Sequence, residues 1–145
     1  GERDFLIVDL PPGTGDAQLS LAQAVPMAGV IIVTTPQNVS LQDSRRGLAM
    51  FQQMNIPILG VIENMTCFIP PDQPDKSYEI FGSGGGNQLA KENKVPLLAQ
   101  VPIESDIFSG TGKDLPVVYT SRDSITAKVF LKLAGTICNS LSVSY

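Results

Sequence analysis

The residues best placed to do chemistry lie in the string DLPPGTGD at positions 9–16. The apolar run Phe5–Val8 leads into the carboxylate of Asp9, and two prolines and two glycines follow. This order predicts a buried strand that ends in an acid, then a tight loop whose backbone can approach a ligand closely. A carboxylate at the end of a parallel strand suits a Mg²⁺ shell, and nearby glycine N–H groups suit phosphate oxygens. The string predicts the Walker-B half of a nucleotide site, and a turn-capping Asp9 is the alternative.

The other half of such a site would be a lysine-bearing phosphate loop, GxxxxGK[ST], which occurs nowhere in the 145 residues. The first residue is Gly1 rather than Met. From both observations we expect a fragment or trimmed chain whose phosphate loop lies upstream of residue 1. Such a fragment is expected to hydrolyse no ATP by itself.

Composition predicts one domain over residues 1–145, without an internal boundary. Apolar residues make up 43% and charged residues 17%, which is enough for a core, and the net charge of −4 argues against a nucleic-acid partner. No apolar run approaches the roughly 18 residues of a membrane span, and no signal peptide opens the chain. Two cysteines without a disulfide framework favour a reducing cytoplasm, and the chain has no histidine.

Short strands rich in Val, Ile and Leu alternate with helical patterns along the chain. The predicted strands are 5–9, 29–34, 58–62 and 97–101, with a weaker one at 117–119. The predicted helices are 17–25 with Asp16 as N-cap, 40–54, 87–93, and 122–141 with Ser121 as cap. This alternation predicts an α/β fold with a mainly parallel sheet and helices on both faces. Ligands then bind at the carboxyl ends of the strands, and residues 67–77 form a long irregular loop.

Four strings in this order resemble the Mrp/ApbC proteins, which are MinD-like P-loop ATPases implicated in carrying iron–sulfur clusters. They are DLPPGTGD at 9–16, VTTPQ at 33–37, ENM at 63–65 and IFGSGGG at 80–86. The resemblance implies a dimeric ATPase that binds Mg-ATP and holds a labile cluster for transfer to apo-proteins. It nearly spans the chain, and its first and last strings are unusual.

On the phosphate side, the resemblance implies three groups. Asp9 would be the Walker-B acid and Mg²⁺ ligand, and Gly13 and Gly15 would belong to the switch loop that senses the γ-phosphate. Asp43 would be a switch-proximal acid with a catalytic role. The alternative for Asp43 is an acid in the first turn of a helix, where the helix dipole favours it.

On the base side, the resemblance makes Asn64 the residue whose amide reads the adenine edge. An amide offers both a donor and an acceptor, which suits adenine N6 and N7. Pro102 and Ile103, with Glu104, match the stretch that lines the other side of the base. The alternatives are a strand-end turn at Asn64 and an ordinary loop at 102–104.

The glycine cluster at 82–86 precedes a predicted helix and has three interpretations. Free N–H groups at a helix N-terminus form an anion site. The resemblance instead gives a structural loop near the cluster site, and flexible turn chemistry is the third interpretation. Asn87 and Gln88 stand where a phosphate loop would need Lys and Ser or Thr, so this is not that loop.

Most members of the resembled family carry Cys-x-x-Cys after the Asn-Met pair, and two such pairs in a dimer would hold a [4Fe–4S] cluster. This chain has only Cys67 there, followed by FIPPDQP. Cys67 is therefore the implied cluster ligand, or else a half-buried residue at a loop start. Cys138 lies in the last predicted helix, where a core position is expected. Two other arrangements could hold a cluster. A dimer could supply two copies of both cysteines, or other ligands could complete a [2Fe–2S] site.

Two rival functions remain open from sequence. One is a non-catalytic interaction module that binds partners through Pro70–Pro74. The other is a MinD- or ParA-type partitioning ATPase with an amphipathic membrane helix at its C-terminus. Helix 122–141 has only three basic residues, which is more typical of a packed core helix.

Overall fold

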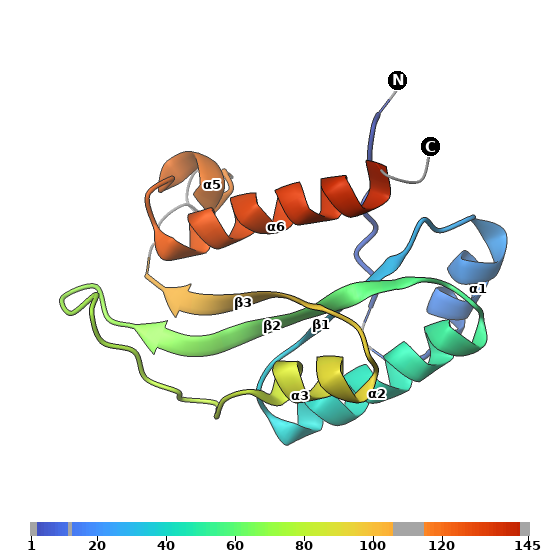
Figure 1. Cartoon of the computed structure of the whole chain (residues 1–145), viewed down its shortest axis with the longest axis horizontal. Coiled ribbons are helices and arrows are strands. Elements are labelled where there is room, and N and C mark those ends of the chain that lie inside the picture. The colour runs from blue at the N-terminus through green and yellow to red at the C-terminus, as the bar shows by residue number, and fades with distance from the viewer. Residues whose placement is uncertain (1–2, 12, 106–114, 143–145) are drawn as a thin grey trace.

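A three-stranded parallel sheet lies between two layers of helices in the computed structural model, which describes residues 3–11, 13–105 and 115–142 (Figure 1). The strand order is β1-β2-β3. The elements are α1 Asp16–Ala24, β1 Val30–Thr34, α2 Asn38–Gln53, β2 Ile58–Ile69, α3 Gly85–Glu92, β3 Leu97–Glu104, α5 Val117–Thr120 and α6 Ile125–Ser142. The predicted α/β class and parallel sheet are confirmed.

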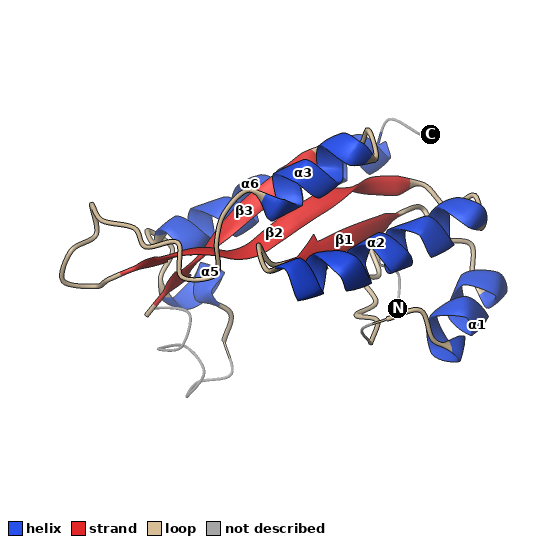
Figure 2. Cartoon of the chain, turned by 90° about the horizontal axis from the view of Figure 1, so that it is seen from below, coloured by secondary structure: helices blue, strands red, loops and turns tan. Residues whose placement is uncertain are grey.

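The helices cover both faces of the sheet. On one face α2 packs on β1 and α3 on β2, while on the other α6 packs on β3 (Figure 2). The core lies under the first layer, because apolar residues of α2 and α3 meet inward residues of the strands. It consists of Ile32, Leu41, Leu48, Phe51, Val61, Leu89 and Ala90. Leu48, Val61 and Leu89 are almost completely buried.

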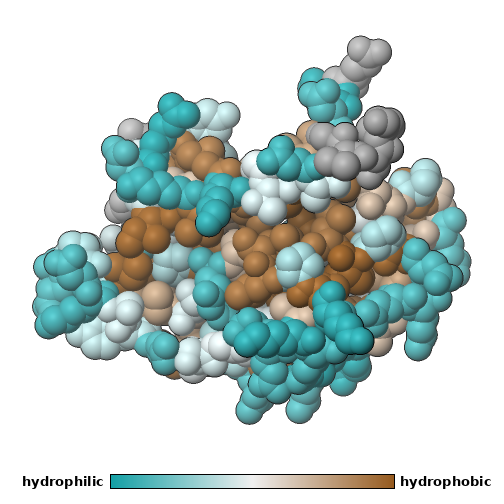
Figure 3. Space-filling view, in the orientation of Figure 1, coloured by the Kyte–Doolittle hydropathy of each residue, from teal (hydrophilic) through white to brown (hydrophobic). Residues whose placement is uncertain are grey.

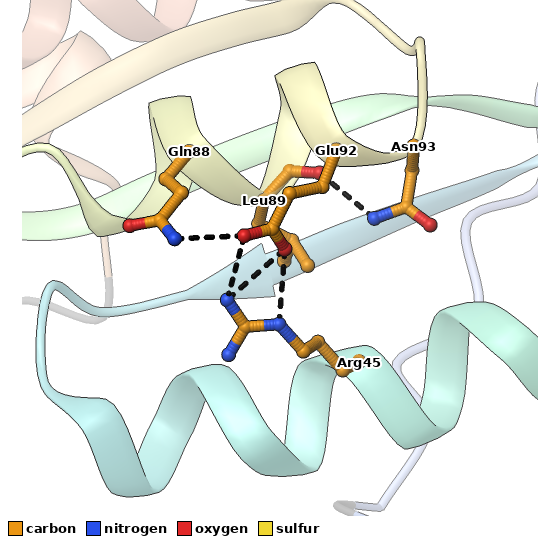
Figure 4. Close-up of polar contacts among 5 residues, drawn as sticks. All are labelled: Arg45, Gln88, Leu89, Glu92 and Asn93. Atoms are coloured by element: carbon orange, nitrogen blue, oxygen red, sulfur yellow. Dashed lines mark hydrogen bonds and ion pairs between the residues drawn. The ribbon is translucent and has the colours of Figure 1, made fainter.

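A polar contact on the surface also joins α2 to α3 (Figure 4). The guanidinium of Arg45 on α2 lies 3.0 Å from the carboxylate of Glu92 on α3, and Gln88 donates a 2.7 Å hydrogen bond to the same carboxylate. The hydrogen bonds that Gln88 and Arg45 donate to this carboxylate hold the pKa of Glu92 below its usual 4.5. The bond from Gln88 has the larger effect. The side chain of Asn93 closes the end of α3 by donating to Leu89 O at 2.9 Å.

Strands β2 and β3 run further than the sequence predicted. Residues 67–69 belong to β2, where Phe68 lies opposite Ile103 and Ile69 opposite Glu104. Phe68 and Tyr78 also exchange two backbone hydrogen bonds, of 2.8 and 2.9 Å. The irregular loop therefore starts at Pro70 rather than at Cys67, because neighbours on both sides hold the backbone of 67–69 extended.

The predicted first strand, 5–9, is wrong: this segment joins no strand of the described sheet. Leu6 and Ile7 are 85% and 88% exposed, and only Leu10 packs against the core. A strand needs a neighbouring backbone for its hydrogen bonds, and an apolar run alone does not supply one. Asp9 therefore lies in an exposed irregular segment.

The weak strand predicted at 117–119 is also wrong, because these residues form the short helix α5. Pro116 precedes it, and its carbonyl accepts a 2.9 Å hydrogen bond from Tyr119 N. Short apolar runs do not separate strand from helix, so this local turn decides. The last helix begins at Ile125 rather than Arg122. Its cap is Ser124 rather than Ser121, since Ser124 Oγ accepts from Ala127 N at 3.1 Å.

Candidate functional site

A buried glutamine of α1 binds two backbone carbonyls of the segment before that helix. Gln18 is 3% exposed, and its Nε2 donates to Pro11 O at 2.6 Å and to Gly13 O at 3.3 Å. Gly13 has φ +95°, a conformation that favours glycine, and nothing lies within 4 Å of a Cβ added there. Gln18 therefore holds the carbonyls of Pro11 and Gly13, and the space beside Gly13 is open, which suits close approach by a ligand.

The residues around this loop differ from the prediction in one detail. The N-cap of α1 is Gly15, and Asp16 is the first helical residue. The Asp16 carboxylate thus lies in the first turn, where the positive end of the helix dipole favours an acid. Asp9 and the two glycines stay close along the chain, with Asp9 exposed before the loop.

A bulge in β2 places the predicted base-side residues next to each other. Asn64 lies opposite Val101 and Phe68 opposite Ile103, so three residues of β2, 65–67, face the single residue Pro102 of β3. Proline has no N–H to give to the ladder, which accounts for the interruption at this point. The bulge brings Asn64 and Cys67 beside Pro102 and Ile103. The sequence alone does not show this proximity, because it depends on how β2 and β3 pair.

The conformation at the bulge holds one end of the Asn64 amide, whose role in base recognition stays a prediction. Its Oδ1 accepts a hydrogen bond of 2.9 Å from the N–H of Met65, which has φ +56°. The side chain of Asn64 is half-buried, and no hydrogen bond from its Nδ2 occurs within the described part of the chain. The amide is thus held at its oxygen while its nitrogen remains available to a ligand.

Asp43 lies away from the start of its helix, because α2 begins at Asn38 and has no acid in its first turn. The alternative of a first-turn acid is therefore wrong. Asp43 forms an ion pair with Arg46 one turn later, and both side chains are at least half exposed. Its role as a switch-proximal acid stays a prediction.

Three functional residues escaped the sequence analysis: Gln18 at the loop, and Glu63 and Gln100 on the sheet. Glu63 is fully buried. It accepts hydrogen bonds from the N–H of Gly86 and, at 2.9 Å, from Nε2 of Gln100. The only signal for this network was the acid within the string ENM, since Gln100 becomes its neighbour through the register alone.

The hydrogen bonds of Glu63 also affect the interpretation of the glycine cluster at 82–86. Gly84 is the N-cap of α3 with φ +74°, and Gly85 and Gly86 are buried against α2 and β2. A Cβ on Gly86 would lie 2.7 Å from Cβ of Glu63, and one on Gly85 would lie 2.9 Å from Pro36 O. The acceptor at this helix N-terminus is therefore the chain's own Glu63 side chain. Gly85 and Gly86 are thus closely packed, and a role of the glycine cluster near an iron–sulfur site stays a prediction.

The two cysteines lie in different elements. Cys67 is a half-buried residue of the β2 bulge, with Thr66 Oγ1 3.9 Å from its sulfur, whereas Cys138 lies in α6. Within residues 3–11, 13–105 and 115–142, no group of three or more His, Cys, Asp or Glu side chains could hold a metal ion. The role of Cys67 as a cluster ligand stays a prediction.

The layered parallel sheet, with loop and amide at the strand ends, defines a P-loop NTPase fold of the MinD type. A family model described as "ParA: NUBPL iron-transfer P-loop NTPase" matches residues 1–138, so the chain belongs to that family. No helix in the described ranges has the length and apolarity needed to cross a membrane.

Named relatives agree with this assignment. The "Iron-sulfur cluster carrier protein" of Synechocystis is 55% identical over 144 residues, 99% of this chain and 41% of that protein. The cell division ATPase MinD of Pyrococcus furiosus has a TM-score of 0.71 at 26% identity, over 94% of this chain and 52% of that one. An Archaeoglobus fulgidus nucleotide-binding protein in complex with ADP has a TM-score of 0.66 at 31% identity, covering 88% and 54%. The chain thus spans less than half the length of the Synechocystis relative.

Proposed function

We propose that the protein in its full length is an ATP-binding and ATP-hydrolysing carrier of iron–sulfur clusters. The observation that carries the proposal is the β2 bulge, where the Asn64 amide lies beside Pro102 and Ile103. The chain that contains this bulge belongs to a family of iron-transfer P-loop NTPases. The ADP-bound Archaeoglobus relative and the Synechocystis carrier support its two parts, nucleotide binding and cluster transfer.

The chain's own residues fit a magnesium nucleotide. Asp9 is exposed and would supply a carboxylate to the Mg²⁺ shell, and bound Mg²⁺ offsets phosphate charge. Gly13 and Gly15 would present backbone beside the γ-phosphate, because the space next to Gly13 is open. Asn64 would bind the adenine edge, and Pro102 and Ile103 would line the other side of the base. Asp43 would act near the switch loop.

Cluster carriage requires a thiolate at an accessible position, and Cys67 is the residue that we assign to it. The cluster is cargo here, passed on to apo iron–sulfur proteins. We further propose a homodimer in which each chain contributes its Cys67 to one shared cluster, whose remaining ligands are groups other than these two thiolates. The cytoplasm is the proposed location, without nucleic-acid or membrane partners.

The test is the magnesium-dependent ATPase rate of the full-length protein with Asp9→Asn. We expect a rate lower by roughly a hundredfold, because the amide keeps the shape of the carboxylate but loses the charge that faces Mg²⁺. Asp4→Asn is the matched control, since Asp4 is another exposed carboxylate of the same segment. Equal rates for the wild type and Asp9→Asn would contradict the proposal.

A further inference from the structure

The buried carboxylate of Glu63 requires a structural reason for its position. A charged group fully removed from water is costly unless hydrogen bonds compensate it. Glu63 has two such bonds, one from the Gly86 N–H on α3 and one from the Gln100 side chain on β3. One side chain of the central strand therefore connects two neighbouring elements.

The contact with α3 replaces a missing helix cap. The first N–H groups of a helix have no partner within it, and the N-cap Gly84 has no side chain to supply one. Glu63 supplies an acceptor there from the sheet. Gly86 allows this approach, because a Cβ at that position would lie 3.0 Å from Oε2 of Glu63.

The contact with β3 joins Glu63 to the strand that carries the other predicted base-side residues, Pro102 and Ile103. Gln100 lies directly opposite Glu63 in the register, and Val101 lies opposite Asn64. The residues that follow the Glu63–Gln100 pair are therefore Asn64 on one strand and Val101–Ile103 on the other. One further pair, Asn64 with Val101, separates the Glu63–Gln100 pair from the bulge.

From these contacts we propose that Glu63 is a positioning residue for the base site. Its carboxylate ties the start of α3 and Gln100 together, which fixes the strand positions just before the bulge. The bulge in turn sets the orientation of the Asn64 amide, whose Oδ1 is held by Met65 N. Glu63 thereby acts on adenine recognition through Asn64, without touching the base; this consequence rests on the proposed function.

The first measurement is amide hydrogen exchange of this chain without ligand, in the wild type and in Glu63→Ala. We expect exchange faster by roughly tenfold both at Gly86 and at residues 65–67, because the variant removes the hydrogen bonds of a buried carboxylate. Glu92→Gln is the matched control, since Glu92 lies at the opposite end of α3 and outside the network. The control should leave exchange at residues 65–67 unchanged.

The second measurement is the ratio of ATP to GTP affinity of the full-length protein. A misaligned Asn64 should lower this ratio in Glu63→Ala by roughly tenfold, whereas a general loss of stability would weaken both nucleotides equally. Glu63→Gln should restore much of the ratio, because its amide can still bond Gly86 and, after Gln100 turns over, Gln100. If Glu63→Ala does not fold, Gln100→Met removes one contact only and should lower the ratio in the same direction.

The two measurements separate two failures. Faster exchange at Gly86 alone, with residues 65–67 and the nucleotide ratio unchanged, would overturn the positioning role. A wild-type protein that binds neither nucleotide would overturn the proposed function, and exchange at 65–67 would still decide whether Glu63 fixes the bulge.

Discussion

At the scale of single residues, the two thiols have different surroundings. Cys67 lies in the irregular part of β2, where Pro102 interrupts the ladder and where Asn64 is also found. Cys138 belongs to the regular helix α6 and is half-buried there. The register therefore places Cys67 close to the predicted base-side residues Asn64 and Pro102.

We therefore expect Cys67→Ala to lower the iron bound by the full-length protein to less than about half, because iron–sulfur clusters bind through thiolates. The measurement is iron content after anaerobic reconstitution with iron and sulfide. Cys138→Ala is the matched control and should keep the wild-type content. Full iron content in Cys67→Ala would remove Cys67 as a ligand.

At the scale of elements, α3 is held at both of its ends, by the sheet at its start and by α2 at its end. Glu63 fixes the N-terminus of α3 from the sheet, while Arg45 fixes its last turn through Glu92 (Figure 4). The ion pair is solvent-exposed, so its contribution to stability is small and depends on charge. Its effect should therefore appear in the pH dependence of unfolding.

The pKa of Glu92 is lowered in the folded chain, so its ionised form stabilises the fold above the unfolded-state pKa near 4.5. This stabilisation is lost as the pH falls through the lower, folded-state pKa. We expect Glu92→Gln to have a lower urea midpoint than the wild type at pH 7, and this difference to shrink below pH 4.5. Arg45→Gln should behave in the same way, and a difference that persists at low pH would contradict the assignment.

At the scale of the whole molecule, a large apolar surface faces solvent. Figure 3 shows apolar residues across the middle of one face, between α6 and the α2–α3 layer. A shallow pocket of about 130 Å³ between β3 and α6 is lined partly by Leu98, Val129 and Leu133. On the N-terminal segment Leu6 and Ile7 are almost fully exposed. Surfaces of this kind promote association.

The 145-residue chain should thus self-associate, and sedimentation at micromolar concentration should give a mass above the 15.5 kDa of one chain. Ile7→Lys should shift the distribution toward the monomer, because it places a charge within the exposed apolar segment. Gln23→Lys adds the same charge on the polar surface of α1 and serves as the control. A wild-type chain that sediments as a monomer would show that this surface does not associate.

Local patterns alone were sufficient for much of the fold. Val30–Thr34 and the start of β2 are continuous runs of β-branched and aliphatic residues, and α2 carries Leu41, Leu48 and Phe51 at helical spacing. These patterns reflect burial of one element at a time, so the sequence shows them directly. The string at 9–16 likewise carried the family resemblance without any knowledge of contacts.

Contacts between distant residues needed the tertiary structure. The Glu63–Gln100 hydrogen bond joins residues 37 positions apart, and the bulge at 65–67 depends on Pro102 in another strand. The segment 5–9 shows the converse, because an apolar run becomes a strand only beside a partner. The sequence thus indicated most of the helices and strands and the family that the chain resembles. Only the packing of strand against strand decided which side chains meet at the site, since register is a property of two segments together.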